Sequence, residues 1–295
     1  MNLRYIATID IGGSSFCGSL YTYGLELVAV SDKYPTKSYA SKEVFLEKIL
    51  SIISDLKHAN SIDSLSGISV SSPGPLDVEN GIILDTPNIK AIQNLHIQKE
   101  IENMFNCITS VQNDANLFAY GESYIHRVKD MVAVTLGTGL GFSIIHNDYI
   151  FLGSNKMACE YGLSPIDSNE KTWEDILTIR WFNQISAEKL GKMMDPEDVY
   201  NLARESNKDA LSIWSMFGKN LGMCLAHAIN FIDPTIIVIG GGISQAHKYF
   251  HKPMEAMLSA SSPSFVHNKI DIIYSKDTKQ SSQLGAARYI RRKLG

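Results

Sequence analysis

Two glycine-rich turns in the sequence carry the residue types that hold phosphate groups. Asp10-Ile-Gly-Gly-Ser-Ser15 and Leu136-Gly-Thr-Gly-Leu-Gly141 each lie between two β-prone runs, which is the pattern of a hairpin. Glycine lets a phosphate oxygen approach the backbone N–H groups closely, and nearby hydroxyls can donate to the same oxygen. Either turn alone is equally compatible with a plain glycine hairpin, because short glycine motifs recur by chance.

The candidate phosphate ligands are the backbone amides and hydroxyls of Gly12, Gly13, Ser14, Ser15, Gly137, Thr138 and Gly139. Asp10 ends the first β-prone run, where its carboxylate could hold Mg²⁺ through water, since magnesium keeps most of its hydration shell. The second turn lacks the Gly-Lys-Ser/Thr of a Walker loop, and the strand-like segment after it argues against a dinucleotide fingerprint. Two such turns facing each other would form a phosphate clamp.

An Asn-Asp pair, Asn113-Asp114, follows the apolar residue Val111 and opens a predicted helix. A carboxylate within hydrogen-bond reach of a hydroxyl group can accept its proton during phosphoryl transfer, so Asp114 is a candidate general base. Asn113 would then hold a neighbouring hydroxyl. The alternative is a helix cap, which is the common use of Asn and Asp at such positions.

Two further segments could contact a ligand. Gly240-Gly241-Gly242 follows the apolar run Ile236–Ile239, and consecutive glycines permit either close approach of a flat ligand or a tight turn between strand and helix. Glu160 lies among small and apolar residues, although an isolated glutamate is usually solvated.

The elements that must position these residues occur in the same order in two halves of the sequence. β-prone hairpins are expected at 5–21 and 131–146, and buried-type strands running into glycine or proline turns at 65–75 and 236–244. Gly12 and Gly137 occupy matching places in the two hairpins. We therefore expect two α/β halves, each starting with a β-meander and continuing with βα crossovers.

Apolar periodicity and helix start or stop signals predict helices at 43–57, 115–126, 211–232 and 284–294. The predicted domains are residues 1–116 together with the closing helix 284–295, and residues 117–283. The segment around 153–202 is polar and less regular, which favours an insertion into the second domain.

Length and composition indicate a globular protein of two domains. The chain has 295 residues, of which 44% are hydrophobic and 20% charged, with a formal net charge of −4. This charge gives no reason to expect a nucleic-acid partner. The four cysteines form no CxxC pair, which fits a reducing compartment, and neither a signal sequence nor a membrane-spanning run is recognisable. A cytoplasmic protein without a membrane partner is expected.

Taken together and in order, these motifs resemble those of the ROK family of sugar kinases and repressors. The segments that carry the resemblance are Asp10–Ser14, Ser72–Pro75, Pro87–Asn88, Asn113–Asn116, Leu136–Gly141, Ile239–Ile243 and Gln283–Ala287. The resemblance implies an α/β fold with two ribonuclease H-like (actin-like ATPase) domains flanking a cleft. It also suggests a homodimer.

The resemblance implies ATP and Mg²⁺ as cofactors and direct in-line transfer to a sugar hydroxyl. Asp114 would be the catalytic base, Mg²⁺ would lie near Asp10, and adenosine would lie at Gly241 and Gly242. The implied sugar-binding residues are Asn88, Asn113, Asp114, Glu160 and Glu174.

The sequence departs from the family where most members carry Glu-x-Gly-His followed by a cysteine-rich zinc loop. Here Leu163 replaces the histidine and no such cysteines follow, so no zinc site is expected. Zinc-free members include bacterial β-glucoside kinases, which phosphorylate the 6-hydroxyl of β-linked glucose compounds such as cellobiose or gentiobiose. An apolar wall at Leu163 is compatible with an aglycone or a second sugar.

We weigh three alternatives to a β-glucoside kinase. The sugar could be a monosaccharide such as glucose or N-acetylmannosamine. A sugar-sensing repressor would need a helix-turn-helix ahead of the first turn, and Asp10 leaves no room for one. A non-catalytic sugar-binding protein would fit the missing histidine, but the retained Asp10, Asp114 and glycine turns argue against it.

Overall fold

The protein is described by a computed structural model of residues 4–39, 41–86, 89, 92–168 and 170–295. The chain divides into two compact units. Unit 1 holds the chain up to Arg127 together with Thr278–Gly295, and unit 2 is Val128–Asp277. The sequence placed these boundaries after residue 116 and before residue 284. The observed boundaries differ from both predicted ones. Boundaries at 116 and 284 would cut through two continuous helices that pack against each other in unit 1.

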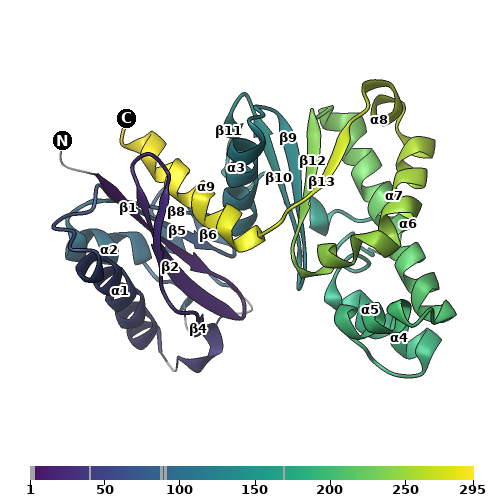
Figure 1. The fold of residues 1–295 in the computed structure, drawn as a ribbon, viewed down its shortest axis with the longest axis horizontal. Coiled ribbons are helices and arrows are strands. Elements are labelled where there is room, and N and C mark those ends of the chain that lie inside the picture. Colours follow the sequence, from purple (N-terminus) through teal and green to yellow (C-terminus); the bar gives the residue numbers. More distant parts are fainter. Residues whose placement is uncertain (1–3, 40, 87–88, 90–91, 169) are drawn as a thin grey trace. The chain divides into compact units, whose positions relative to one another are not determined.

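Unit 1 is built on a mixed sheet with the strand order β3-β2-β1-β5-β8 (Figure 1). Its strands are β1 (Tyr5–Ile11), β2 (Ser15–Thr22), β3 (Leu27–Val30), β5 (Gly67–Ser72) and β8 (Ile108–Asn113), with β4 (Tyr34–Pro35) paired to β2. The first three form an antiparallel meander, and β5 and β8 run parallel to β1. A small separate sheet joins β6 (Leu76–Asp77) and β7 (Ile82–Ile83).

Unit 2 repeats this topology with the strand order β11-β10-β9-β12-β13. Its strands are β9 (Met131–Leu136), β10 (Leu140–His146), β11 (Tyr149–Ile150), β12 (Ile236–Gly240) and β13 (Asp271–Tyr274). Again three strands form an antiparallel meander, and two follow in parallel to the first. The predicted duplication of α/β halves, each beginning with a hairpin, is therefore confirmed.

The helices of unit 1 cover both faces of its sheet (Figure 1). They are α1 (Lys42–Ala59), α2 (Ile97–Phe105), α3 (Asp114–His126) and α9 (Thr278–Lys293), with a short 3-10 helix η1 (Thr36–Ser38). Ala7, Ile9 and Ile11 belong to one core with α1, whereas Ile6 packs with Ile290 of α9. Because side chains alternate along a strand, Asp10 must face α9.

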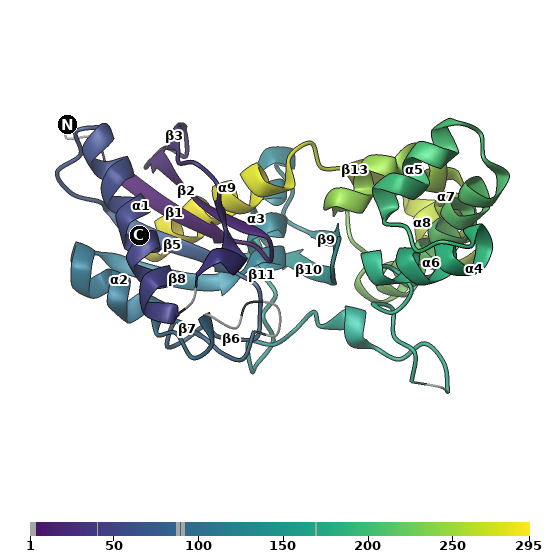
Figure 2. The ribbon, with the colours of Figure 1, turned by 90° about the horizontal axis from the view of Figure 1, so that it is seen from below.

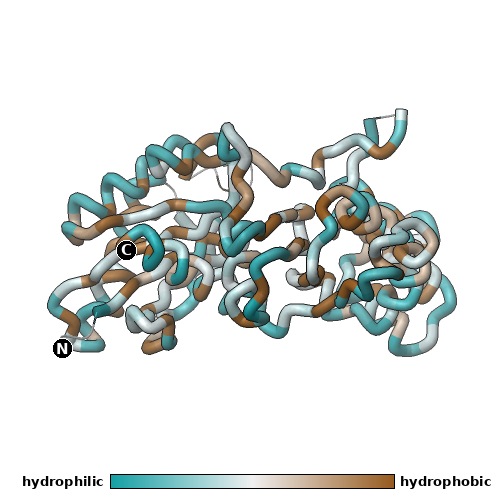
Figure 3. The backbone as a smooth tube through the Cα atoms, turned by 90° about the horizontal axis from the view of Figure 1, so that it is seen from above, coloured by the Kyte–Doolittle hydropathy of each residue, from teal (hydrophilic) through white to brown (hydrophobic). Residues whose placement is uncertain are grey.

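The helices of unit 2 are α4 (Ile179–Leu190), α5 (Pro196–Arg204), α6 (Lys208–Ile232), α7 (His247–Ser261) and α8 (Pro263–Asn268), with 3-10 helices η3 (Tyr161–Leu163) and η4 (Gly242–Ala246). Brown and teal residues alternate along them in Figure 3, as expected for helices with one buried side. No helix among the described residues has both the length and the apolar composition to cross a membrane.

The segment predicted as an irregular insertion, 153–202, is only partly irregular. Residues between β11 and α4 form an extended loop with the short helix η3 (Figure 2), but α4 and α5 are regular helices. Trp181, Phe182 and Val199 are buried in the same core as Trp214 of α6. The polar residues of this segment misled the sequence prediction, because they occupy the exposed sides of two amphipathic helices.

Helices α3 and α9 of unit 1 cross at two glycines. A Cβ atom added at Gly121 would lie 1.9 Å from the Ser281 carbonyl oxygen, and one added at Gly285 would lie 1.9 Å from the Leu117 carbonyl oxygen. The two backbones are therefore in contact, and this contact fixes where the first turn of α9 meets the sheet.

Candidate functional site

The predicted site residues that the structure describes in unit 1 lie at the carboxyl ends of β1 and β8, which flank β5. Asp10 pairs in register with Ser71, Ser71 pairs with Gln112, and Ser72 pairs with Asn113. Two strand spacings therefore separate Asp10 from Gln112, roughly 10 Å. The first glycine turn and the Asn113–Asp114 pair leave this edge together, and ligands of open α/β sheets bind at such carboxyl ends.

The first glycine turn is held from one side by Thr36. The Gly12 N–H donates to the Ser15 carbonyl oxygen at 3.0 Å, which closes the turn. Thr36 donates through its N–H to the Ser14 carbonyl oxygen at 3.0 Å and through Oγ1 to the Gly12 carbonyl oxygen at 2.8 Å. A Cβ atom added at Gly13 would meet no atom within 4 Å. The turn thus has open space beside Gly13, where a phosphate could approach.

Asp10 is a buried carboxylate, with 7% of its surface exposed. Burial raises its pKa above the ordinary range, while hydrogen bonds from Ser71 and Ser282 and the positive charge of Lys279 act in the opposite direction. The Ser282 hydroxyl donates to Asp10 Oδ1 at 3.1 Å. A nearby cation would favour the ionised carboxylate still further.

These residues fit a magnesium ion that arrives with a nucleotide. Such an ion needs one or two carboxylates and otherwise keeps water and phosphate oxygens as ligands. Asp10 supplies one carboxylate beside the turn. Within the described ranges, no group of three or more His, Cys, Asp or Glu side chains could hold a metal ion.

The Asn113–Asp114 pair caps helix α3, as the alternative interpretation predicted. Asn113 is the N-cap, and its Oδ1 accepts from the N–H groups of Ala115 at 3.0 Å and Asn116 at 3.3 Å. Asp114 Oδ1 accepts from the Ala115 N–H at 2.8 Å. Capping does not exclude a substrate contact, since a carboxylate offers about four acceptor positions. It fixes the orientation of both side chains at the strand edge.

Sequence reasoning missed the residues that support this pair and the first turn. Gln112 is buried, and its Oε1 accepts from the Asn113 N–H at 2.8 Å and from Asn116 Nδ2 at 3.2 Å. Its position directly before the Asn-Asp pair, next to the apolar Val111, was the available signal. Ser282 and Lys279, by contrast, carry no local signal, because they reach the first turn only through the packing of α9.

In unit 2, Glu174 lies against the second glycine turn. The Gly137 N–H donates to the Gly139 carbonyl oxygen at 3.1 Å, and the Leu140 N–H donates to Glu174 Oε2 at 3.4 Å. The Glu174 N–H donates to the Gly162 carbonyl oxygen at 2.9 Å. This backbone bond places the Glu160–Leu163 segment beside the same turn.

Glu160 and Glu174 form an acidic pair within unit 2. The pKa of Glu160 is raised, first by partial loss of solvent around its carboxyl group and then by the charge of Glu174. Tyr161 packs on Phe142, with ring centroids 5.2 Å apart, and Leu163 is 57% exposed. The unit thus combines two carboxylates with an exposed apolar side chain, which suits hydrogen bonding to hydroxyls beside an apolar surface.

In the glycine run after β12, Gly241 allows a close backbone contact, whereas Gly242 has open space beside it. Gly241 has φ +88°, and a Cβ atom there would lie 2.2 Å from the Leu136 carbonyl oxygen. This supports the tight-turn interpretation for Gly241. A Cβ atom at Gly242 would meet nothing within 4 Å. Gly242 is therefore the position of the run that leaves room for a ligand.

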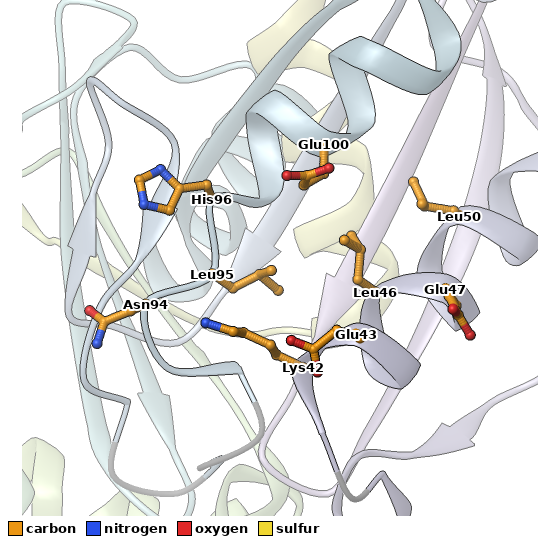
Figure 4. Close-up of a pocket in the computed structure, with 9 residues that line it drawn as sticks. All are labelled: Lys42, Glu43, Leu46, Glu47, Leu50, Asn94, Leu95, His96 and Glu100. Carbon is orange, nitrogen blue, oxygen red and sulfur yellow. The ribbon is translucent and has the colours of Figure 1, made fainter.

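A pocket of about 360 Å³ in unit 1 is lined by other residues (Figure 4). Leucines from α1 and from the segment before α2 line it together with charges of both signs: Lys42, Glu43, Leu46, Glu47, Leu50, Asn94, Leu95, His96 and Glu100. None of the predicted site residues that the structure describes lines it, so we assign it no part in the chemistry. Asn88, a predicted sugar ligand, lies outside the described residues.

Comparison with known proteins gives consistent relatives across the whole chain. The sequence model of the ROK family matches residues 6–293. A glucokinase of Thermotoga maritima is 25% identical, with 97% of each chain covered.

Two solved structures share the fold. A ROK hexokinase from Thermus thermophilus has a TM-score of 0.83 at 19% identity, with 99% of this chain and 100% of that chain covered. A ROK family glucokinase from Streptomyces griseus in complex with glucose and AMPPNP has a TM-score of 0.79 at 20% identity, with the same coverage. The predicted α/β class with two actin-like domains is confirmed, and the chain belongs to the ROK family.

Proposed function

We propose that this protein transfers the γ-phosphoryl group of ATP to the 6-hydroxyl of a β-linked glucose compound such as cellobiose or gentiobiose. The enzyme class is an ATP-dependent carbohydrate kinase. One observation carries the proposal: the first glycine turn and the Asn113–Asp114 pair leave the carboxyl ends of β1 and β8, which flank β5 at one edge of the unit 1 sheet. Phosphoryl transfer needs a phosphate cradle and a proton acceptor held within one site.

The residues of the chain have distinct roles in this reaction. The amides of Gly12 and Gly13 and the hydroxyls of Ser14 and Ser15 bind phosphate oxygens, and we assign phosphate binding to Gly137, Thr138 and Gly139 as well. Bound Mg²⁺, with Asp10 as its protein carboxylate, supplies positive charge to the phosphate oxygens. Asp114 accepts the proton of the attacking hydroxyl, while Asn113 orients a neighbouring hydroxyl. We assign the adenosine to the Gly241–Gly242 segment, where Gly241 forms the tight turn and Gly242 leaves room for the ligand.

The sugar is held by carboxylates and limited by an apolar side chain. We assign Glu160 and Glu174, with Asn88, to the sugar hydroxyls. The exposed Leu163, in the place of the family histidine, favours a substrate that carries an aglycone or a second sugar ring over a free monosaccharide. The Streptomyces griseus glucokinase was solved with glucose and AMPPNP, a sugar and an ATP analogue, which fits the same general reaction.

A coupled assay with ATP and a panel of sugars tests the substrate. We expect kcat/KM for cellobiose or gentiobiose to exceed that for glucose and N-acetylmannosamine by about tenfold or more. This is the effect expected from one additional apolar contact, here between the second sugar ring and Leu163. Higher kcat/KM for a free monosaccharide would refute the β-glucoside assignment and leave a monosaccharide kinase. Sugar binding without phosphorylation of any sugar would refute the kinase and favour a binding protein.

Sugar binding is expected to depend on the ionisation of Glu160. Only the ionised carboxylate is purely an acceptor for sugar hydroxyls. Because the pKa of Glu160 is raised, the carboxylate is lost as pH falls through a value above the ordinary glutamate range. The KM for the sugar should therefore rise on acidification, starting at a higher pH than an unperturbed glutamate would give.

Steady-state KM values measured from pH 4.5 to 8 check this expectation. Glu160→Gln should show a raised KM at neutral pH and a flatter pH profile. Glu170→Gln, a change of an exposed glutamate in the same loop, is the matched control and should keep the wild-type profile. An unchanged KM in Glu160→Gln would contradict the assigned role.

A further inference from the structure

Side chains from the first two turns of α9 bond to the first glycine turn and to the strands on either side of it. Lys279 Nζ donates to Ser15 Oγ at 3.0 Å. Ser282 donates to Asp10 and lies 3.1 Å from Ser71 Oγ. Gln283 Nε2 contacts Cys17 Sγ at 3.2 Å on the strand that follows the turn. Lys279 lies 264 positions after Ser15 in the sequence, so no motif near the turn predicts these contacts.

Lys279 brings a positive charge to a turn whose other ligands are neutral. The backbone amides and the hydroxyls of Ser14 and Ser15 carry no net charge, and the side chain of Asp10, at the start of the turn, is an acid. Burial raises the pKa of both Asp10 and Cys17, and the positive charge of Lys279 opposes that rise at each of them. No ion pair joins Lys279 to a carboxylate of the described residues. Its ammonium group is exposed and bonded to a neutral hydroxyl.

We propose that Lys279 is a nucleotide-binding residue whose ammonium group contacts the terminal phosphates of ATP at the first glycine turn. The inference rests on the proposed function, because it needs a polyphosphate at this turn. Ser15 Oγ holds the ammonium group beside the phosphate position before the nucleotide binds. A phosphate oxygen can then take both the Lys279 N–H and the Ser15 O–H as donors, and a charge-assisted hydrogen bond is the stronger kind.

The position of Lys279 also explains how a turn without a Walker lysine can hold a polyanion. In a Walker loop the lysine follows the glycines directly and reaches the β- and γ-phosphates. Here the first turn continues as Ser14-Ser15-Phe16 into β2, which leaves no lysine in the loop. Helix α9 supplies the cation instead, and the Gly121–Gly285 contact with α3 keeps its first turn at that place.

Titration calorimetry with AMPPNP, ADP and AMP in the presence of Mg²⁺ tests the proposal. Lys279→Met should weaken AMPPNP binding about tenfold or more, the usual cost of losing a hydrogen bond to a charged group. AMP has no terminal phosphates, so its Kd should change by less than about threefold. Lys279→Arg should recover part of the AMPPNP affinity, because it keeps a cation at the turn.

Lys33→Met is the matched control. Lys33 is also exposed and its charge also acts on Cys17, so the variant makes the same change in net charge without touching the turn. Its AMPPNP affinity should equal that of the wild type within about twofold. Should Lys279→Met fold poorly by circular dichroism, the comparison is made on Lys279→Gln, which keeps a donor for Ser15 Oγ and removes only the charge.

The outcomes separate this inference from the proposed function. If the wild type phosphorylates sugar and Lys279→Met binds AMPPNP as tightly as the wild type, only the role of Lys279 is overturned. An equal loss of AMP and AMPPNP affinity would also overturn it, since it would indicate a structural effect. Failure of the wild type to bind AMPPNP would overturn both the kinase assignment and the role of Lys279.

Discussion

Asp114→Asn is expected to lose about a thousandfold or more in kcat while the protein stays folded. A positioned general base contributes about 10²–10⁴ in rate, and asparagine cannot accept the hydroxyl proton. The fold should persist because the asparagine oxygen can still accept from the Ala115 N–H, as Asp114 Oδ1 does at 2.8 Å. The sugar KM should change much less than kcat, since the amide keeps one acceptor for the hydroxyl.

Steady-state kinetics at saturating ATP check the Asp114 prediction. Asp209→Asn is the matched control, because Asp209 also lies in the first turn of a helix capped by asparagine: Asn207 Oδ1 accepts from the Asp209 and Ala210 N–H groups, each at 3.0 Å. This control should keep kcat within about twofold. Near-normal turnover in a pure, folded Asp114→Asn preparation would remove the general base from the mechanism.

Gly285→Ala is expected to destabilise the protein by about 3 kcal/mol or more, the upper range for overpacking. The added Cβ atom would lie 1.9 Å from the Leu117 carbonyl oxygen and 2.8 Å from the Gly121 nitrogen. Both are backbone atoms of α3, so relief requires helix α9 to move. Helix propensity alone predicts the opposite sign, a gain of about 1 kcal/mol for Gly→Ala within a helix.

Urea unfolding followed by circular dichroism measures this difference. Gly24→Ala serves as the comparison, because a Cβ atom there would meet only the Thr22 Oγ1 atom, at 3.4 Å. Its free energy of unfolding should change by less than about 1 kcal/mol. A Gly285→Ala protein at least as stable as the wild type would mean that α3 and α9 do not cross as closely as described. Displacement of α9 should also weaken nucleotide binding, since Lys279 and Ser282 would move with it.

Local patterns predicted the elements whose signals lie within short windows of sequence. The glycine hairpins became β1–β2 and β9–β10, and apolar periodicity located α1 and α6 to within a few residues. The cap at Asn113 followed from residue type alone. Each of these features depends on interactions between residues close in sequence, which is why propensity and periodicity suffice.

Long-range packing decided the features that were predicted incorrectly. Helix α9 begins at Thr278, not at Leu284, although its start contains threonine and two serines, which are weaker helix formers. Ser282 bonded to Asp10 and Ser281 bonded to Glu122 at 2.7 Å hold that turn on the sheet and on α3. Tertiary contacts of this kind override weak local preference.

The sequence by itself determined the chemistry available to the protein: the glycine turns, the carboxylates Asp10 and Asp114, the family to which they belong, and the missing histidine at Leu163. Only the tertiary structure decided which residues stand beside these groups. Parallel pairing of β1, β5 and β8 brings Asp10 and Asn113 to one edge, and the packing of α9 brings Lys279 to Ser15. The physical reason is that hydrogen bonds and charge act over a few ångströms, whereas the residues that share them lie up to hundreds of positions apart in the chain.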